Sequence, residues 1–181
     1  IPPIAVPVSR RIQPCMVSPA WKGLHAMANN IDARLNELGL SIPDAPAPAA
    51  NYVPFTISGN LVFVAGQVPF VDGKLTKTGR IGENASAEDG YEQARICAIN
   101  LIAQVKAACG GDLDRVRRVV KLGGFVASAP DFTGQPGVIN GASDLMVEVF
   151  GDAGKHARFA VGTNVLPLGC LVEIDGIFEI G

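Results

Sequence analysis

The stretch HARFAVGTNVLPLGCLVEIDGIFEI, from His156 to Ile180, holds two apolar runs around a proline- and glycine-containing turn, and it decides the fold. Both runs read as strands, in which side chains alternate between two faces. In the second run the apolar face is formed by Val172, Ile174, Phe178 and Ile180, and the opposite face by Glu173, Asp175, Ile177 and Glu179. The second strand is therefore expected to lay one face on a core and to turn its carboxylates away from it.

One cation, Arg158, lies in the first strand, on the same face as Ala160 and Gly162. We expect this face, like that of Glu173, to point away from the core and therefore to contact water or line a pocket. A guanidinium offers a planar fork that fits a carboxylate, and a glutamate in an apolar cleft can serve as an acid or base. The residues alone leave two plainer alternatives open: a structural ion pair of Arg158 with Glu173 or Asp175, and solvated carboxylates.

The segments before this strand pair predict a layered α+β domain. Strands are expected at Tyr52–Ser58, Leu61–Ala65, Val68–Val71 and Val116–Ala127, and helices at Ser86–Ala108 and Gly137–Phe150. Gly59-Asn60 and Asp72-Gly73 mark tight turns, and Gly123-Gly124 marks a bulge or a close backbone neighbour. The element order predicts an antiparallel-rich sheet with two helices packed on one face.

A sheet covered on one face leaves the other face bare. Here we expect Ala160, Gly162 and Ile177 to share the bare face with the charged residues. Apolar and charged side chains mixed on an uncovered sheet favour an oligomer whose pockets fall between subunits.

The part of the chain before residue 51 has a different composition. Residues 1–26 are rich in proline and are expected to be an N-terminal extension, either a tag, upstream sequence or an accessory segment. Residues 27–50 are expected to hold a short helix capped by Asn30 and then a Pro/Ala linker. The compact domain is expected to span 51–181.

Charge argues against nucleic-acid binding. Residues 1–26 carry three basic residues and no acid, so the remaining 12 basic residues stand against all 17 acids and that part has a net charge of −5. Affinity for nucleic acid comes largely from basic residues that displace counterions.

Four cysteines and two histidines limit metal and disulfide chemistry. Cys15, Cys97, Cys109 and Cys170 form no C-x-x-C pair, which favours reduced thiols in a cytoplasmic protein. His25 and His156 cannot supply a histidine-rich metal cluster, so we expect no metal. No apolar run approaches the roughly 20 residues of a membrane span.

Several of these segments together resemble a known family. NLVFVAGQVP (Asn60–Pro69), the Ser86–Ala108 helix, the helix holding Ile139-Asn140, and HARFAVG…LPLG…VEID resemble the RidA/YjgF family of imine and enamine deaminases, also labelled L-PSP-like endoribonucleases. The resemblance covers about 51–181 and points to a longer, divergent branch.

The resemblance implies a chorismate-mutase-like fold, a homotrimer with a central barrel, and sites in the clefts between subunits. It implies hydrolysis of reactive 2-imino and enamino acids to 2-keto acids and ammonia, without a cofactor. By the same resemblance, Arg158 holds the substrate carboxylate, Glu173 positions water or shuttles a proton, and Asn140 and the Gly66 backbone contact the substrate.

Three positions depart from the family pattern. Phe55 stands where the family has a site tyrosine, Ala65 where it has a serine, and Ala160 where it has a cysteine. Phe55 and Ala160 are expected to line the substrate site as apolar residues. Three polar groups are thus lost while Arg158 and Glu173 remain.

The sequence leaves three functions open. The first is a cofactor-free imine deaminase that acts on a small carboxylate. The second is a non-catalytic trimer that binds a small carboxylate or a partner protein, as the three departures suggest. The third is an endoribonuclease, which the acidic domain and the lack of a histidine pair disfavour.

Overall fold

The computed structural model describes residues 30–45 and 51–181. The expected extension at 1–26, with Cys15 and His25, lies outside these residues. The first element is helix α1 (Ile31–Glu37), whose cap is as expected, since the Asn30 side chain accepts a hydrogen bond from the Ala33 backbone. Ile31 and Leu35 are both 4% exposed and belong to the main core, so α1 packs on the domain.

A five-stranded sheet forms one layer of the domain. Its strands are β1 (Phe55–Ser58), β2 (Leu61–Gln67), β5 (Val116–Ala127), β6 (Ala157–Thr163) and β7 (Val172–Ile180). They are arranged β1-β2-β7-β5-β6, and every pair except β5–β6 is antiparallel. The expected antiparallel-rich sheet is confirmed.

A separate two-stranded hairpin joins β3 (Phe70–Val71) to β4 (Lys74–Leu75). Its turn residues Asp72 and Gly73 both have positive φ, 49° and 74°, as a type I′ turn requires. The aspartate-glycine pair thus set this turn, as expected.

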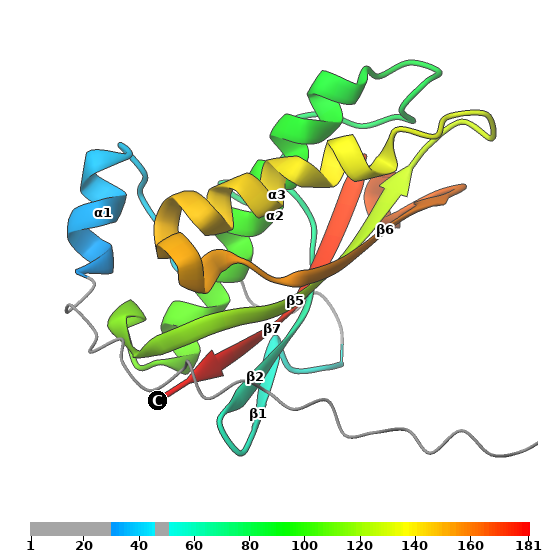
Figure 1. Ribbon diagram of the computed structural model, residues 1–181. Coiled ribbons are helices and arrows are strands. Elements are labelled where there is room, and N and C mark those ends of the chain that lie inside the picture. Colours follow the sequence, from blue (N-terminus) through cyan, green and yellow to red (C-terminus); the bar gives the residue numbers. More distant parts are fainter. Residues whose placement is uncertain (1–29, 46–50) are drawn as a thin grey trace, which may run out of the picture.

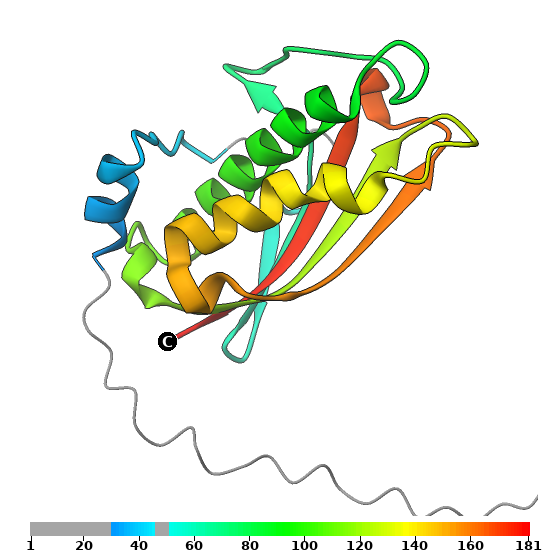
Figure 2. The same ribbon diagram turned by 45° about the horizontal axis from the view of Figure 1, so that its top comes forward.

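Helices α2 (Ala87–Ala108) and α3 (Gln135–Phe150) lie side by side across one face of the sheet (Figures 1 and 2). Ser86 and Asp89 form a capping box at the start of α2. Helix α3 begins two residues earlier than expected because Pro136, which has no N–H to donate, suits the first turn. Short 3₁₀ turns occupy Leu113–Arg115, Gly151–Gly154 and Pro167–Gly169.

The core lies between these helices and the sheet. The side chains of Leu122, Ile174 and Phe178 are all 0% exposed beneath the helices. On the opposite face, Phe63 and Phe125 remain 38% and 39% exposed. The expected contrast between a covered face and a bare, partly apolar face is confirmed.

The expectation that Arg158 points away from the core is wrong. Arg158 pairs in register with Leu122 and Ala160 pairs with Gly124, and both partners face the helices. A Cβ on Gly124 would meet Ile139 of α3, and Ala160 packs against the main core. Gly162 pairs with Val126, which is 0% exposed, so Arg158, Ala160 and Gly162 all lie on the helix side of the sheet. The expectation that Ala160 and Gly162 share the bare face is therefore also wrong, whereas Glu173 and Asp175 lie on the bare side.

Candidate functional site

Arg158 is held by three hydrogen bonds from α3. Its Nη1 donates to Asn140 Oδ1 and to Ser143 Oγ, both at 2.9 Å, and its Nη2 donates to the Pro136 carbonyl at 3.2 Å. Within residues 30–45 and 51–181 no carboxylate pairs with it, so the alternative of a structural ion pair is wrong for the single chain.

The sequence of α3 explains this cluster. Asn140 and Ser143 are three residues apart, so they share one face of the helix, and Pro136 lies one turn before Asn140. The N-cap of α3 is Gly134, so Asn140 lies inside the helix and does not cap it. Because β6 is the outer strand beside α3, its arginine can reach this face.

His156 extends the cluster from the turn before β6. Its Nε2 lies 3.0 Å from Ser143 Oγ, and its Nδ1 lies 2.6 Å from the Gly154 carbonyl oxygen. A carbonyl only accepts, so Nδ1 carries the proton and the neutral ring accepts the Ser143 hydroxyl hydrogen at Nε2. Burial lowers the pKa of His156 from its ordinary 6.5, and the Arg158 charge lowers it further.

Glu173 occupies the bare face beside a break in the β2–β7 ladder. The register shifts between Val64 and Gln67, and a Cβ on Gly66 would touch the Glu173 carboxylate. Burial, together with the nearby Asp175 carboxylate, raises the pKa of Glu173 above 4.5. No hydrogen bond or ion pair to Glu173 comes from the described part of the chain, so its carboxylate is free to act on a ligand or water.

The candidate site residues thus form two separate groups. Arg158, Asn140 and Ala160 lie together on the helix side at the β6 edge, and Glu173 and Gly66 lie together on the bare side. Strand β5 separates β6 from β7, which places the two charged residues about 10 Å apart across the strands. In the register Arg158 is level with Gly176, three residues from Glu173, so they are also offset by about 10 Å along the strands and lie on opposite faces. Phe55 lies on β1, at the other edge of the sheet, and packs against the main core.

Ser143 and the Pro136 carbonyl were not anticipated as partners of Arg158. The spacing Asn140-x-x-Ser143, two small polar residues on one helix face, is the signal that could have identified them. It was weak, because such residues usually face solvent.

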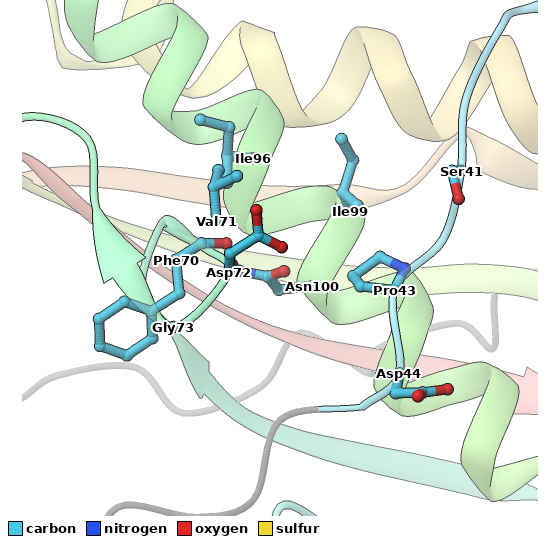
Figure 3. Close-up of a pocket in the computed structure, with 10 residues that line it drawn as sticks. All are labelled: Ser41, Pro43, Asp44, Phe70, Val71, Asp72, Gly73, Ile96, Ile99 and Asn100. Carbon is cyan, nitrogen blue, oxygen red and sulfur yellow. Dashed lines mark hydrogen bonds between the residues drawn. The ribbon is translucent and has the colours of Figure 1, made fainter.

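A hollow of about 640 Å³ lies elsewhere, between α2, the β3–β4 hairpin and the segment after α1. Figure 3 shows Ile96 and Ile99 on one wall, facing Val71 and Pro43. Asp44 and Asp72 stand at its rim. It contains none of the candidate site residues, so its size gives no support to the proposed chemistry.

Across residues 30–45 and 51–181, no three His, Cys, Asp or Glu side chains are placed to hold a metal ion. The helices of this part are also too short or too polar to cross a membrane.

Comparison with known proteins yields consistent similarities. A family described as "YjgF/chorismate_mutase-like, putative endoribonuclease" matches residues 32–179. The protein TCP17 of Trypanosoma cruzi is 47% identical over 154 residues, which cover 84% of this chain and 96% of that protein.

Two solved structures are similar along most of their length. The protein Atu1372 of Agrobacterium tumefaciens, described as of unknown function, is 53% identical with a TM-score of 0.78 and covers 83% of this chain and 92% of its own. A protein of Shewanella oneidensis described as a "putative endoribonuclease" is 35% identical with a TM-score of 0.80, over 84% of this chain and 100% of that one.

Proposed function

The chain belongs to the YjgF/chorismate mutase-like family, and from that premise we propose that it hydrolyses reactive 2-imino and enamino acids to 2-keto acids and ammonia. The reaction takes place between copies of the chain and uses no cofactor. A cytoplasmic location fits a role in removing such intermediates.

The observation that supports the proposal most is that Arg158 is held by hydrogen bonds but has no carboxylate partner. A guanidinium has five N–H donors, and three hydrogen bonds hold it to Asn140, Ser143 and Pro136. Its Nε–H and one N–H of Nη2 remain for a ligand. All of its protein partners are neutral, so its charge remains available for a substrate carboxylate.

The reaction also requires a group that transfers protons, and Glu173 is proposed for this role. Adding water to the carbon of the imine requires one proton to leave the water and others to reach the departing nitrogen, which is released as ammonia when the C–N bond breaks. A carboxylate with a raised pKa can accept and return a proton near neutral pH. The absence of a side chain at Gly66 leaves room for the Glu173 carboxylate, which a Cβ at this position would meet.

The separation of the two groups supports a shared site. Within one chain Arg158 and Glu173 lie on opposite faces of the sheet, so one ligand can reach both only if a second copy contributes one of them. We propose a homotrimer in which the bare sheet faces close on one another as a central barrel, and each cleft combines Arg158 of one copy with Glu173 of the next.

The test is ammonia and keto-acid release from imines that an amino-acid oxidase generates in the assay. We expect Arg158→Ala to abolish the acceleration. Arg34→Ala is the control, because Arg34 pairs with Glu37 and donates to the Glu148 carbonyl near the C-terminal end of α3, and it has no hydrogen bond to Arg158, Asn140 or Ser143. A wild-type rate equal to that of buffer alone, or full activity in Arg158→Ala, would contradict the proposal.

A second candidate is a non-catalytic trimer that binds a small carboxylate or a partner protein. It is favoured by Phe55, Ala65 and Ala160, which provide no polar side-chain group for the chemistry. Thermal stabilisation by 2-keto acids without turnover of any imine would select it.

Endoribonuclease activity is the weakest candidate, although the family description and several similar structures carry that label. The net charge of −5 over residues 27–181 and a total of two histidines oppose it. RNA cleavage that survives purification and is lost in Glu173→Ala would restore it.

A further inference from the structure

A continuous chain of hydrogen bonds runs from the backbone at Gly154 to Arg158. His156 Nδ1–H donates to the Gly154 carbonyl at 2.6 Å, Ser143 Oγ–H donates to His156 Nε2 at 3.0 Å, and Arg158 Nη1–H donates to Ser143 Oγ at 2.9 Å. The donor and acceptor roles along the chain follow from one another. The Gly154 carbonyl requires the proton on Nδ1 of His156, so Nε2 is an acceptor and the Ser143 hydroxyl donates to it.

We infer that His156 is a positioning residue, which acts through Ser143 to hold Arg158 in the orientation that receives a substrate carboxylate. The inference rests on the proposed function, in which Arg158 binds that carboxylate. It assigns a role to two residues, His156 and Ser143, outside the Arg158–Glu173 pair.

The physical reason lies in the alternative open to Ser143. A serine inside a helix tends to donate its hydroxyl hydrogen to the carbonyl four residues earlier, which here belongs to Ile139. The acceptor on His156 draws the hydroxyl toward β6 instead. The lone pairs of Ser143 Oγ then face Arg158, whose remaining N–H groups are left toward the ligand.

The charged surroundings allow His156 to act as an acceptor. Asp152 and Lys155, in the turn before β6, pair with each other at 2.7 Å. On α3, Asp144 accepts from Tyr91, and Glu148 pairs with Arg95 at 2.6 Å. Arg158 is thus the charged group that acts on the ring, and with burial it keeps His156 neutral at pH 7.

The variants follow from this chain. His156→Phe removes the acceptor and keeps a ring, His156→Gln restores an acceptor near Nε2, and Ser143→Ala removes the link itself. The matched control is Tyr91→Phe, which loses a 2.9 Å hydrogen bond to Asp144 between α2 and α3 but touches no member of the chain. Melting temperatures of all variants separate folding from binding.

The experiment measures KM and kcat for an imino acid, and calorimetric binding of 2-oxobutanoate, a 2-keto acid probe that needs no turnover. We expect His156→Phe and Ser143→Ala to weaken 2-oxobutanoate binding and raise KM by about tenfold with little change in kcat, as loss of a bond to a charged group predicts. His156→Gln should recover most of the loss, and Tyr91→Phe should match the wild type.

The outcomes distinguish the two proposals. Binding of 2-oxobutanoate without imine turnover refutes the deaminase and still tests the positioning role. Wild-type binding by both His156→Phe and Ser143→Ala, or equal losses in His156→Phe and His156→Gln, overturns the positioning role alone. Absence of both imine turnover and 2-oxobutanoate binding in the wild type overturns both. If His156→Phe does not fold, Ser143→Ala decides.

Discussion

Arg158 and Glu173, on opposite faces of the sheet, differ in their hydrogen-bond partners. On the helix side Arg158 is tied down by three neutral acceptors, so its orientation is fixed while its charge stays unmatched. On the bare side Glu173 has no partner among the described residues, and its pKa is raised. Under the proposed function, the helix side holds a rigid group for binding the substrate, whereas the bare side presents a proton carrier whose surroundings come from another copy.

The largest expected effect comes from placing a charge on the bare face. We expect Phe125→Asp to dissociate the proposed trimer into folded single chains, because three carboxylates would be buried together in the proposed barrel. Light scattering after size exclusion measures the mass, and circular dichroism checks the fold. The control is Val147→Asp on α3, since Val147 is 40% exposed and Phe125 is 39% exposed. An unchanged mass for Phe125→Asp would mean that this face is not an interface.

The second-largest effect is expected from truncating a side chain on the covered face. Phe178 is 0% exposed between the sheet and the helices, and Phe178→Ala should lower the free energy of unfolding by about 4 kcal/mol through lost burial and a cavity. Urea denaturation measures the change. A loss below about 1 kcal/mol would contradict the assignment of the core to this face.

Arg158→Lys tests the rigid binding group. Lysine keeps the charge but lacks the planar fork, so it cannot satisfy Asn140, Ser143 and Pro136 while also presenting two donors to a carboxylate. We expect kcat/KM for an imino acid to fall about 100-fold, or roughly 2.7 kcal/mol. Steady-state kinetics measure it. Full activity in Arg158→Lys would show that the charge alone suffices and that the cluster on α3 has no role in binding.

The smallest expected effect concerns the pH dependence of stability at Glu173. A carboxyl whose folded pKa is raised contributes stability below its unfolded pKa and loses it as pH rises through the folded value. Glu173→Gln mimics the protonated form, so its stability relative to the wild type should increase from pH 4 to pH 8. Denaturation at both pH values measures this.

The control for that experiment lies on the same strand. Glu179 pairs with Arg118 at 3.3 Å and accepts from Asn60, so Glu179→Gln should gain no stability at pH 8. A pH-independent difference between Glu173→Gln and the wild type would contradict a raised pKa.

The sequence was sufficient for most elements and insufficient for the side of the sheet that Arg158 occupies. Ser86 marks the start of α2 and Gly151 the end of α3 through local chemistry, so those limits could be read directly. Alternation tells which residues share a face, but not which face the helices cover. In β7 the four large apolar residues on one face show that this face is covered by the helices. In β6 the residues beside Arg158 are the small Ala160 and Gly162, which do not indicate a covered or a bare face.

The candidate site was predictable in its charged members and not in their supports. Arg158 and Glu173 stand out because charges are rare in apolar strands. Ser143 and His156 do not, since their contact joins α3 to the turn before β6 and exists only once these are packed. The grouping of the candidate residues into two halves also depends on strand order, which local patterns do not determine.

The position of β6 at the edge of the sheet has a consequence for motion. It pairs with β5 alone, while β7 pairs on both sides. Alternate backbone amides of an edge strand have no ladder partner and open at low energetic cost, so in the single chain those of β6 should exchange their hydrogens with solvent much faster than those of β7. Arg158 thus lies on one of the two edge strands of the sheet, and its hydrogen bonds to α3 oppose the opening of that strand.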